Sequence, residues 1–285
     1  MIRKTFAAAM RAARKFVPRN KEPKTVSPLK PMAFLSRIAK IWGVPFKKLQ
    51  PEERSFQRLK IPITPWIFGK RIVKQGSTRG EYKPKTHIIE VDPTDAFTRS
   101  HEITHAGAII ISPAKEYENW TQDTMKTRLA SVSYGFGGYP KVMQAVSKHE
   151  RIADLAGKEK GHSGASLQKF LGLIGIPSIG VIFPPLGVLV GAKYVGREVE
   201  LRTQHRSVRG FYNRHGMDGI ILLSASPPKV FGTLELLSWE KKMIKNGLLA
   251  ESAGLTASGE NHLRRILPKE TILARLKAAE RNRAK

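Results

Sequence analysis

The residues with the clearest chemical potential are His101 and His105, which flank Glu102 in the order His-Glu-Ile-Thr-His. On a helix, side chains four positions apart project from one face, about one turn apart. Two imidazoles at that spacing can occupy neighbouring corners of a tetrahedral zinc ion. The Glu102 side chain is turned by about 100° around the helix, where it can reach a metal-bound water without binding the metal. The spacing therefore predicts a zinc site with Glu102 as general base.

A zinc site needs a third protein ligand, and Glu150 is the main candidate. Residues 141–157 have helical character, and Glu150 shares a face with Val142 and Val146. A carboxylate on an apolar face is costly unless something neutralises it, and a divalent metal would do so. Asp154 follows one turn later on the same side, where it could accept the free N–H of a ligating imidazole.

The residues around the histidine pair predict the elements that must position it. Residues 86–91 are β-branched and apolar enough to form a strand. Asp92 can cap the helix that follows, with Pro93 at its first position and Asp95 in its first turn. Residues 96–111 contain no proline, so we expect one helix to carry the whole motif.

The order H-E-x-x-H followed at a distance by E-x-x-A-D resembles the gluzincin metallopeptidases. The resemblance covers about residues 82–170. It is closest to a membrane-embedded branch that includes the heat-shock protease of bacterial inner membranes, the prenyl-protein endopeptidase and the mitochondrial stress protease. The resemblance implies that substrate backbone lies along a strand edge before the zinc helix, here residues 86–91.

The resemblance also implies a role for each matching residue. His101, His105 and Glu150 would hold Zn²⁺. Glu102 would activate water, and Asp154 would be the orienting acid. In the membrane-embedded branch, hydrophobic spans commonly separate the histidine motif from the third ligand.

This chain departs from that order, because its uncharged run, residues 170–192, follows Glu150. The family order would make Glu200 the third ligand, and Glu200 is the alternative here. Glu150 is preferred because Gln204, and not an aspartate, stands four residues after Glu200. Three single histidines could each stabilise an oxyanion: His149, His162 and His205. A lone histidine is more often simply solvated.

Composition limits the classes of protein and of functional site that remain possible. The 285 residues, 41% of them hydrophobic, can bury a core of ordinary size. The absence of cysteine excludes disulfides, thiolate zinc sites and cysteine nucleophiles. The 50 Lys and Arg residues exceed the 23 acids and give a formal charge of +27, which predicts attraction to nucleic acid or an anionic membrane. Residues 1–50 carry 13 of these bases and one acid, so the excess is concentrated in an arm.

Two segments suggest a membrane. Residues 1–17 form an amphipathic, acid-free pattern that ends at Pro18, and residues 1–19 could be an organellar transit peptide or a helix on an anionic surface. Residues 170–192 are uncharged and long enough to cross about 30 Å of hydrocarbon. Pro184-Pro185 would break a straight span, so a kinked span or re-entrant hairpin is expected, with a buried hairpin in a soluble core as the alternative.

We therefore expect an α+β, predominantly helical protein: a zincin-like metallopeptidase core with a small sheet, plus an apolar membrane-type hairpin or span. The expected regions are a basic arm and linker (1–31), the catalytic core (32–169), the apolar segment (170–192) and a basic helical C-terminal region (193–285).

The expected function is zinc-dependent endopeptidase activity on protein or peptide substrates, at an anionic membrane. Two alternatives stay open. One is a nucleic-acid-binding protein that uses its basic arms, although none of the standard reading motifs is evident. The other is a membrane-bound zincin without catalytic activity.

Overall fold

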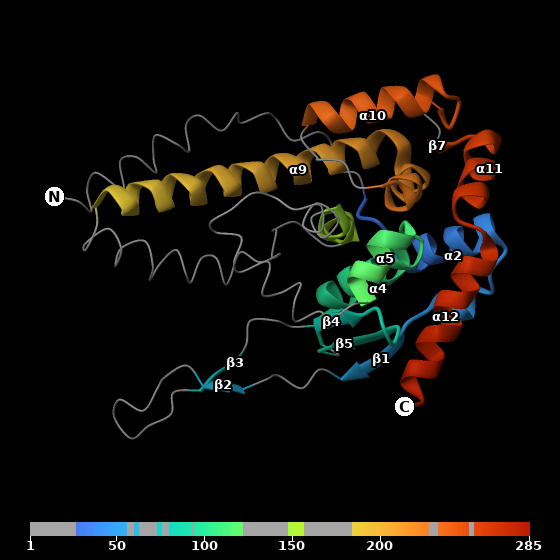
Figure 1. Ribbon diagram of the computed structural model, residues 1–285, viewed down its shortest axis with the longest axis horizontal. Helices are drawn as coiled ribbons and strands as arrows, with labels where there is room; N and C mark the ends of the chain where they lie inside the picture. The colour runs from blue at the N-terminus through green and yellow to red at the C-terminus, as the bar shows by residue number, and fades with distance from the viewer. Residues whose placement is uncertain are drawn as a thin grey trace.

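The computed structural model of the chain describes residues 27–55, 60–62, 73–75, 80–92, 94–121, 148–156, 184–227, 233–250 and 254–285. For residues 60–62, 73–75, 184–202 and 233 it describes the backbone alone. These parts form a mostly helical molecule with a small sheet, as expected for the α+β class (Figure 1).

The main sheet has three short strands in the order β1-β5-β4: β1 (Glu52–Ser55), β5 (Ile88–Val91) and β4 (Gly80–Lys83). The central strand, β5, runs parallel to β1 and antiparallel to β4. Both edges of β5 are therefore paired, and the expectation that residues 86–91 offer an open strand edge is wrong. The two outer strands of this sheet are β1 and β4, and β4 is the one on the antiparallel side of β5.

Two further pairs of strands are antiparallel. β2 (Lys60–Pro62) pairs with β3 (Val73–Gln75), away from the main sheet (Figure 1). β6 (Leu249–Ala250) pairs with β7 (Gly254–Leu255) between two C-terminal helices.

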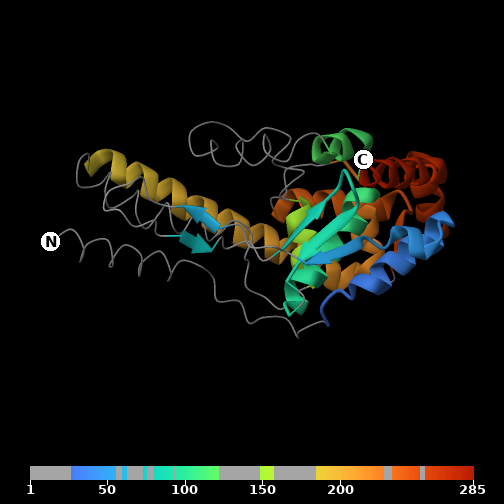
Figure 2. The same cartoon turned by 90° about the horizontal axis from the view of Figure 1, so that it is seen from below.

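The histidine motif lies on α4 (Ala96–Ile110), which packs against the sheet (Figure 2). Asp95 caps this helix, because its carboxylate accepts the N–H of Thr98 at 3.0 Å. The predicted cap, Asp92, instead accepts the N–H and hydroxyl of Thr94 in the preceding turn. The helix is buried from Glu102 to its end, so it is the central element of the core.

Further helices complete the described part of the chain. They are α2 (Pro31–Trp42), α3 (Phe46–Leu49), α5 (Ala114–Thr121), a helix over residues 148–153 that continues as the 3₁₀ turn η1 (Asp154–Ala156), α9 (Pro184–Ala225), α10 (Thr233–Lys245), α11 (Ala257–Ile266) and α12 (Lys269–Arg283). In Figure 1, α11 and α12 follow one side of the molecule next to α2, and α10 lies along α9. The C-terminal region, which we expected to be helical, ends in α12, with Pro268 as its N-cap.

A glycine allows α2 and α4 to pack closely. A Cβ atom on Gly107 would lie 2.8 Å from Cδ2 of Leu35 and 2.9 Å from Cε1 of Phe34. The contact joins one continuous hydrophobic core. Its members come from the sheet and from helices on both sides of residues 170–192, for example Phe34, Ile38, Ile89, Ile109, Phe211, Leu222 and Leu276.

The expectation of a membrane span is wrong for the described chain, where no helix combines the length and the apolar character needed to cross a bilayer. Of the uncharged run, residues 170–183 lie outside the described residues, and α9 begins at Pro184. Proline is tolerated in a first helical turn, so the Pro184-Pro185 pair starts a helix instead of breaking one. The apolar residues 184–192 cover only about 14 Å of α9 before Lys193, against about 30 Å of hydrocarbon.

The N-terminal expectations are not addressed by the structure. Residues 1–26, which include the predicted amphipathic segment, lie outside the described residues. The predicted linker ends where α2 begins, with Pro31 at the start of that helix.

Candidate metal centre

His101 and His105 lie next to each other on one face of α4, as the spacing requires. Their ring centroids are 4.8 Å apart. The His101 side chain is 13% exposed and that of His105 is 5% exposed. This face of α4 is therefore nearly closed to water. Because buried polar groups need a partner, the two imidazoles require another protein group or a metal ion beside them.

Glu150 faces this pair from the helix over residues 148–153. Its Oε2 lies 3.5 Å from Nε2 of His101, and its Oε1 lies 3.5 Å from Nε2 of His105. One ligand atom from each of the three residues lies within 4.8 Å of the others. The structure thus brings Glu150 to a pair of histidines that lie on another helix, 49 and 45 positions earlier in the sequence.

These distances fit a zinc ion. Ligand atoms about 2.1 Å from a tetrahedral centre are about 3.4 Å from one another. Each Nε2 lies 3.5 Å from one oxygen of Glu150, close to that value, with His101 facing Oε2 and His105 facing Oε1. Two nitrogens and a carboxylate oxygen also match the ligand types that catalytic zinc sites use, with a fourth position left for water or substrate. The residues present therefore fit the metal.

The charges of the site couple its three members. Burial disfavours the charged form of His101, but the nearby carboxylate of Glu150, with the charges of Glu102 and Asp154, prevails and raises its pKa to about 9. Burial alone would raise the pKa of Glu150, but the nearby imidazoles of His105 and His101 hold it well below the usual range. A divalent cation would replace the proton that the histidines and Glu150 share in the metal-free site, because metal binding requires deprotonated ligands.

Glu102 lies beside the metal ligands and next to the sheet. Its Oε2 accepts the backbone N–H of Tyr82 on β4 at 2.8 Å. Burial raises the pKa of Glu102, and the charges of His105 and His101 oppose the rise. A raised pKa brings a carboxylate closer to the range in which it can take up and return a proton at neutral pH.

Asp154, the predicted orienting acid, lies behind His101. Its Oδ1 is 3.5 Å from Nδ1 of His101, longer than an ordinary hydrogen bond, and its Oδ2 is 2.9 Å from Nη1 of Arg151. His205 of α9 approaches the same carboxylate, with its Nδ1 3.9 Å from Oδ2. Burial lowers the pKa of His205, so this ring is neutral near pH 7.

Other predicted candidates are placed differently. Glu200 lies within α9, but its side chain is outside the described residues, as is all of His162. His149 is fully buried and points its Nε2 at Glu116, 3.0 Å away, so it is neither a metal ligand here nor a solvated residue.

The sequence did not indicate three residues that support the site. Tyr82 contributes a backbone N–H, which no side-chain pattern reveals. Trp120 of α5 lies between His105 and His149, with its ring 5.9 Å from each. Glu116 holds His149 and Lys148. The spacing of Glu116 and Trp120, one helical turn apart, was the available clue.

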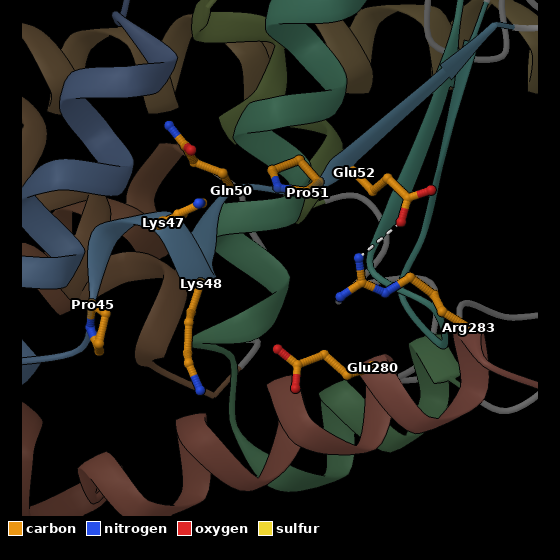
Figure 3. A pocket seen from close by; sticks show the side chains of 8 residues that line it. All are labelled: Pro45, Lys47, Lys48, Gln50, Pro51, Glu52, Glu280 and Arg283. Atoms are coloured by element: carbon orange, nitrogen blue, oxygen red, sulfur yellow. Dashed lines mark hydrogen bonds and ion pairs between the residues drawn. The ribbon is translucent and has the colours of Figure 1, made fainter.

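A surface hollow of about 530 Å³ lies between α3 and α12, and it contains none of the candidate residues (Figure 3). Lys47, Lys48 and Arg283 line it together with two acids, and Arg283 donates to Glu52 at 3.0 Å. The acids offset much of the positive charge, so the hollow is not a strong site for an anion.

Comparisons with known proteins give no relative for this chain: no family model, no curated protein and no solved structure matches it. The site must therefore be interpreted from its own geometry.

Proposed function

We propose that this chain is a zinc-dependent endopeptidase. The observation that carries the proposal is the convergence of His101, His105 and Glu150 from two helices, with one ligand atom of each within 4.8 Å of the others. A divalent cation explains why two nearly buried imidazoles and a carboxylate face one another at these distances.

The chemistry divides between metal and protein. When bound, zinc lowers the pKa of water towards about 7 and polarises the carbonyl of the scissile bond. Glu102 takes the water proton and passes it to the leaving amine. The hydrogen bond from Tyr82 holds the carboxylate at Oε2, so Oε1 is the oxygen proposed to receive the proton. Asp154, whose Oδ1 lies 3.5 Å from Nδ1 of His101, is the group proposed to orient that ring when the metal binds.

The position of β4 supports a peptide as the substrate. β4 is the outer strand on its side of the described sheet, and its Tyr82 backbone touches Glu102. An extended peptide laid along this strand would bring its backbone next to the general base. Pairing of a peptide with the edge of β4 would depend on backbone hydrogen bonds more than on side chains. Such binding suits an endopeptidase that accepts many sequences.

The test is cleavage by the purified full-length chain of an unfolded protein substrate, followed by mass spectrometry of the products. We expect cleavage that stops with a zinc chelator, returns on addition of zinc, and falls at least about 100-fold in Glu102→Gln. Glu118→Gln, which changes an exposed acid on α5, is the matched control and should cleave normally. Cleavage at equal rates in Glu102→Gln would support an inactive zincin contaminated by another protease and contradict the proposal.

A further inference from the structure

The short helix that supplies Glu150 is held by a buried charged cluster on its N-terminal side. Glu116 of α5, Lys148 and His149 form this group, which we call the Glu116 cluster. The side chains of Lys148 and His149 are 0% exposed and that of Glu116 is 4% exposed. Charged groups are rarely buried so deeply without a reason, because the loss of hydration must be offset by good partners.

Lys148 has a partner for each of its ammonium hydrogens. Its Nζ lies 2.8 Å from Oε2 of Glu116, 2.7 Å from the carbonyl oxygen of Ser226 and 3.2 Å from that of Ser224. The two carbonyls are at the C-terminal end of α9, where helix carbonyls lack partners within the helix and a positive charge is favoured. Lys148 thus joins the Glu150 helix to α5 and α9 at one point.

His149 makes a second link to the same carboxylate. Its Nε2 lies 3.0 Å from Oε2 of Glu116, and since a carboxylate only accepts, Nε2 donates. Glu116 therefore holds both residues that immediately precede Glu150. A rotation of the helix about its axis would break these contacts and move Glu150 at the same time.

The same face of α5 also touches the other half of the metal centre. Trp120, four residues after Glu116, packs between the rings of His105 and His149, 5.9 Å from each. One turn of α5 is thus in contact with a histidine ligand on α4 and with the neighbour of the carboxylate ligand.

From these contacts we propose that Glu116 is a positioning residue for the metal centre: it sets the distance between Glu150 and the histidine pair through Lys148 and His149. The inference rests on the proposed zinc site and goes beyond it, since Glu116 touches none of the three ligands in the contacts described. Loss of its charge would leave Lys148 buried without a counter-charge. Because the Lys148 ammonium contacts both carboxylate oxygens, at 2.8 and 3.1 Å, an amide NH₂ in place of one oxygen would also face this ammonium as a second donor.

The experiment compares zinc affinity in the full-length chain, measured by competition with a chromophoric chelator, between wild type and Glu116→Gln. We expect zinc binding to weaken about 10-fold or more, the range seen when an outer partner of a metal ligand is removed. The Co²⁺-substituted proteins should differ in their visible absorption bands, because a displaced carboxylate changes the coordination geometry.

The matched control is Glu240→Gln. Glu240 of α10 is also a buried carboxylate, 7% exposed, and it accepts from Arg214 and His215 at 2.6 to 2.7 Å. This variant should lose stability but keep the wild-type zinc affinity and Co²⁺ spectrum. If Glu116→Gln does not fold, Glu116→Asp keeps the charge, withdraws the oxygens by one methylene and should show a smaller change in the same direction.

Equal zinc affinity and Co²⁺ spectra in wild type and a folded Glu116 variant would overturn the positioning role while leaving the metal centre intact. Equal losses in the Glu116 and Glu240 variants would also overturn it, because general destabilisation would then explain both. A wild-type chain that binds no zinc would overturn the proposed function together with this inference.

Discussion

The backbone N–H of Tyr82 donates a 2.8 Å hydrogen bond to Oε2 of Glu102, so the outer strand of the sheet and the proposed general base are held together. This contact fixes the direction of a carboxylate on a helix whose neighbouring face carries His101 and His105. It also places the reacting group beside the strand along which a peptide would extend.

The first prediction uses that contact. Glu102→Asp keeps the charge but shortens the side chain by one methylene, so the carboxylate cannot keep both its hold on Tyr82 and its reach to water. We expect zinc content to stay at the wild-type level and kcat for peptide cleavage to fall by about 10². Parallel metal analysis and steady-state kinetics measure the two quantities. A variant that cleaves as fast as wild type would show that the position of this carboxylate does not matter.

The second prediction concerns the C-terminal helix. Arg275 of α12 donates from Nη1 to the carbonyls of Ile110 and Ser112, both at 2.7 Å, and lies over the ring of Tyr117. Arg275→Met would leave two buried carbonyls at the end of α4 without this donor. We expect a loss of about 2–4 kcal/mol in the free energy of unfolding, measured with urea.

Its matched control is Arg281→Met, an exposed residue of the same helix, which should change stability by no more than about 0.5 kcal/mol. Equal stability of the two variants would mean that Arg275 does not hold the end of α4.

The third prediction concerns pH. Burial lowers the pKa of His87 to about 4 from 6.5, although its Nε2 lies 3.1 Å from the carbonyl oxygen of Leu49. Between these values the unfolded chain binds a proton that the folded chain does not, so folding is favoured above pH 6.5 and weakens as the pH falls towards 4. The contribution is about 3 kcal/mol at most.

His87→Asn should therefore flatten the dependence of unfolding free energy on pH between 6.5 and 4 in chelator-treated protein. Asparagine suits the backbone there, because His87 has a φ of 53°. Part of the slope should remain, since burial also lowers the pKa of His149 to about 4. Parallel curves for wild type and variant would contradict this assignment.

Local patterns predicted the elements that carry the site, because they depend on neighbouring residues. The strand before the motif and the helix from Ala96 were visible in β-branching and in the absence of proline. The helix start was placed at Asp92 and not at Asp95, since either of these two aspartates can accept a backbone N–H. The pairing of β5 on both sides was not predictable, because strand order depends on distant residues.

The three residues of the candidate metal centre were predicted by spacing and resemblance, and the residues that support them were not. Glu116 and Lys148 are 32 positions apart, and nothing local indicates that they meet. The membrane expectation for residues 170–192 was wrong, because the composition of this run does not reveal that a helix starts within it, at Pro184.

The most direct test of the metal centre is the zinc content of the purified full-length chain, measured by plasma mass spectrometry for wild type and Glu150→Ala. We predict about one zinc ion per wild-type chain and nearly none in the variant. A wild-type chain without zinc, or a Glu150→Ala chain that keeps it in full, would contradict a centre built from His101, His105 and Glu150.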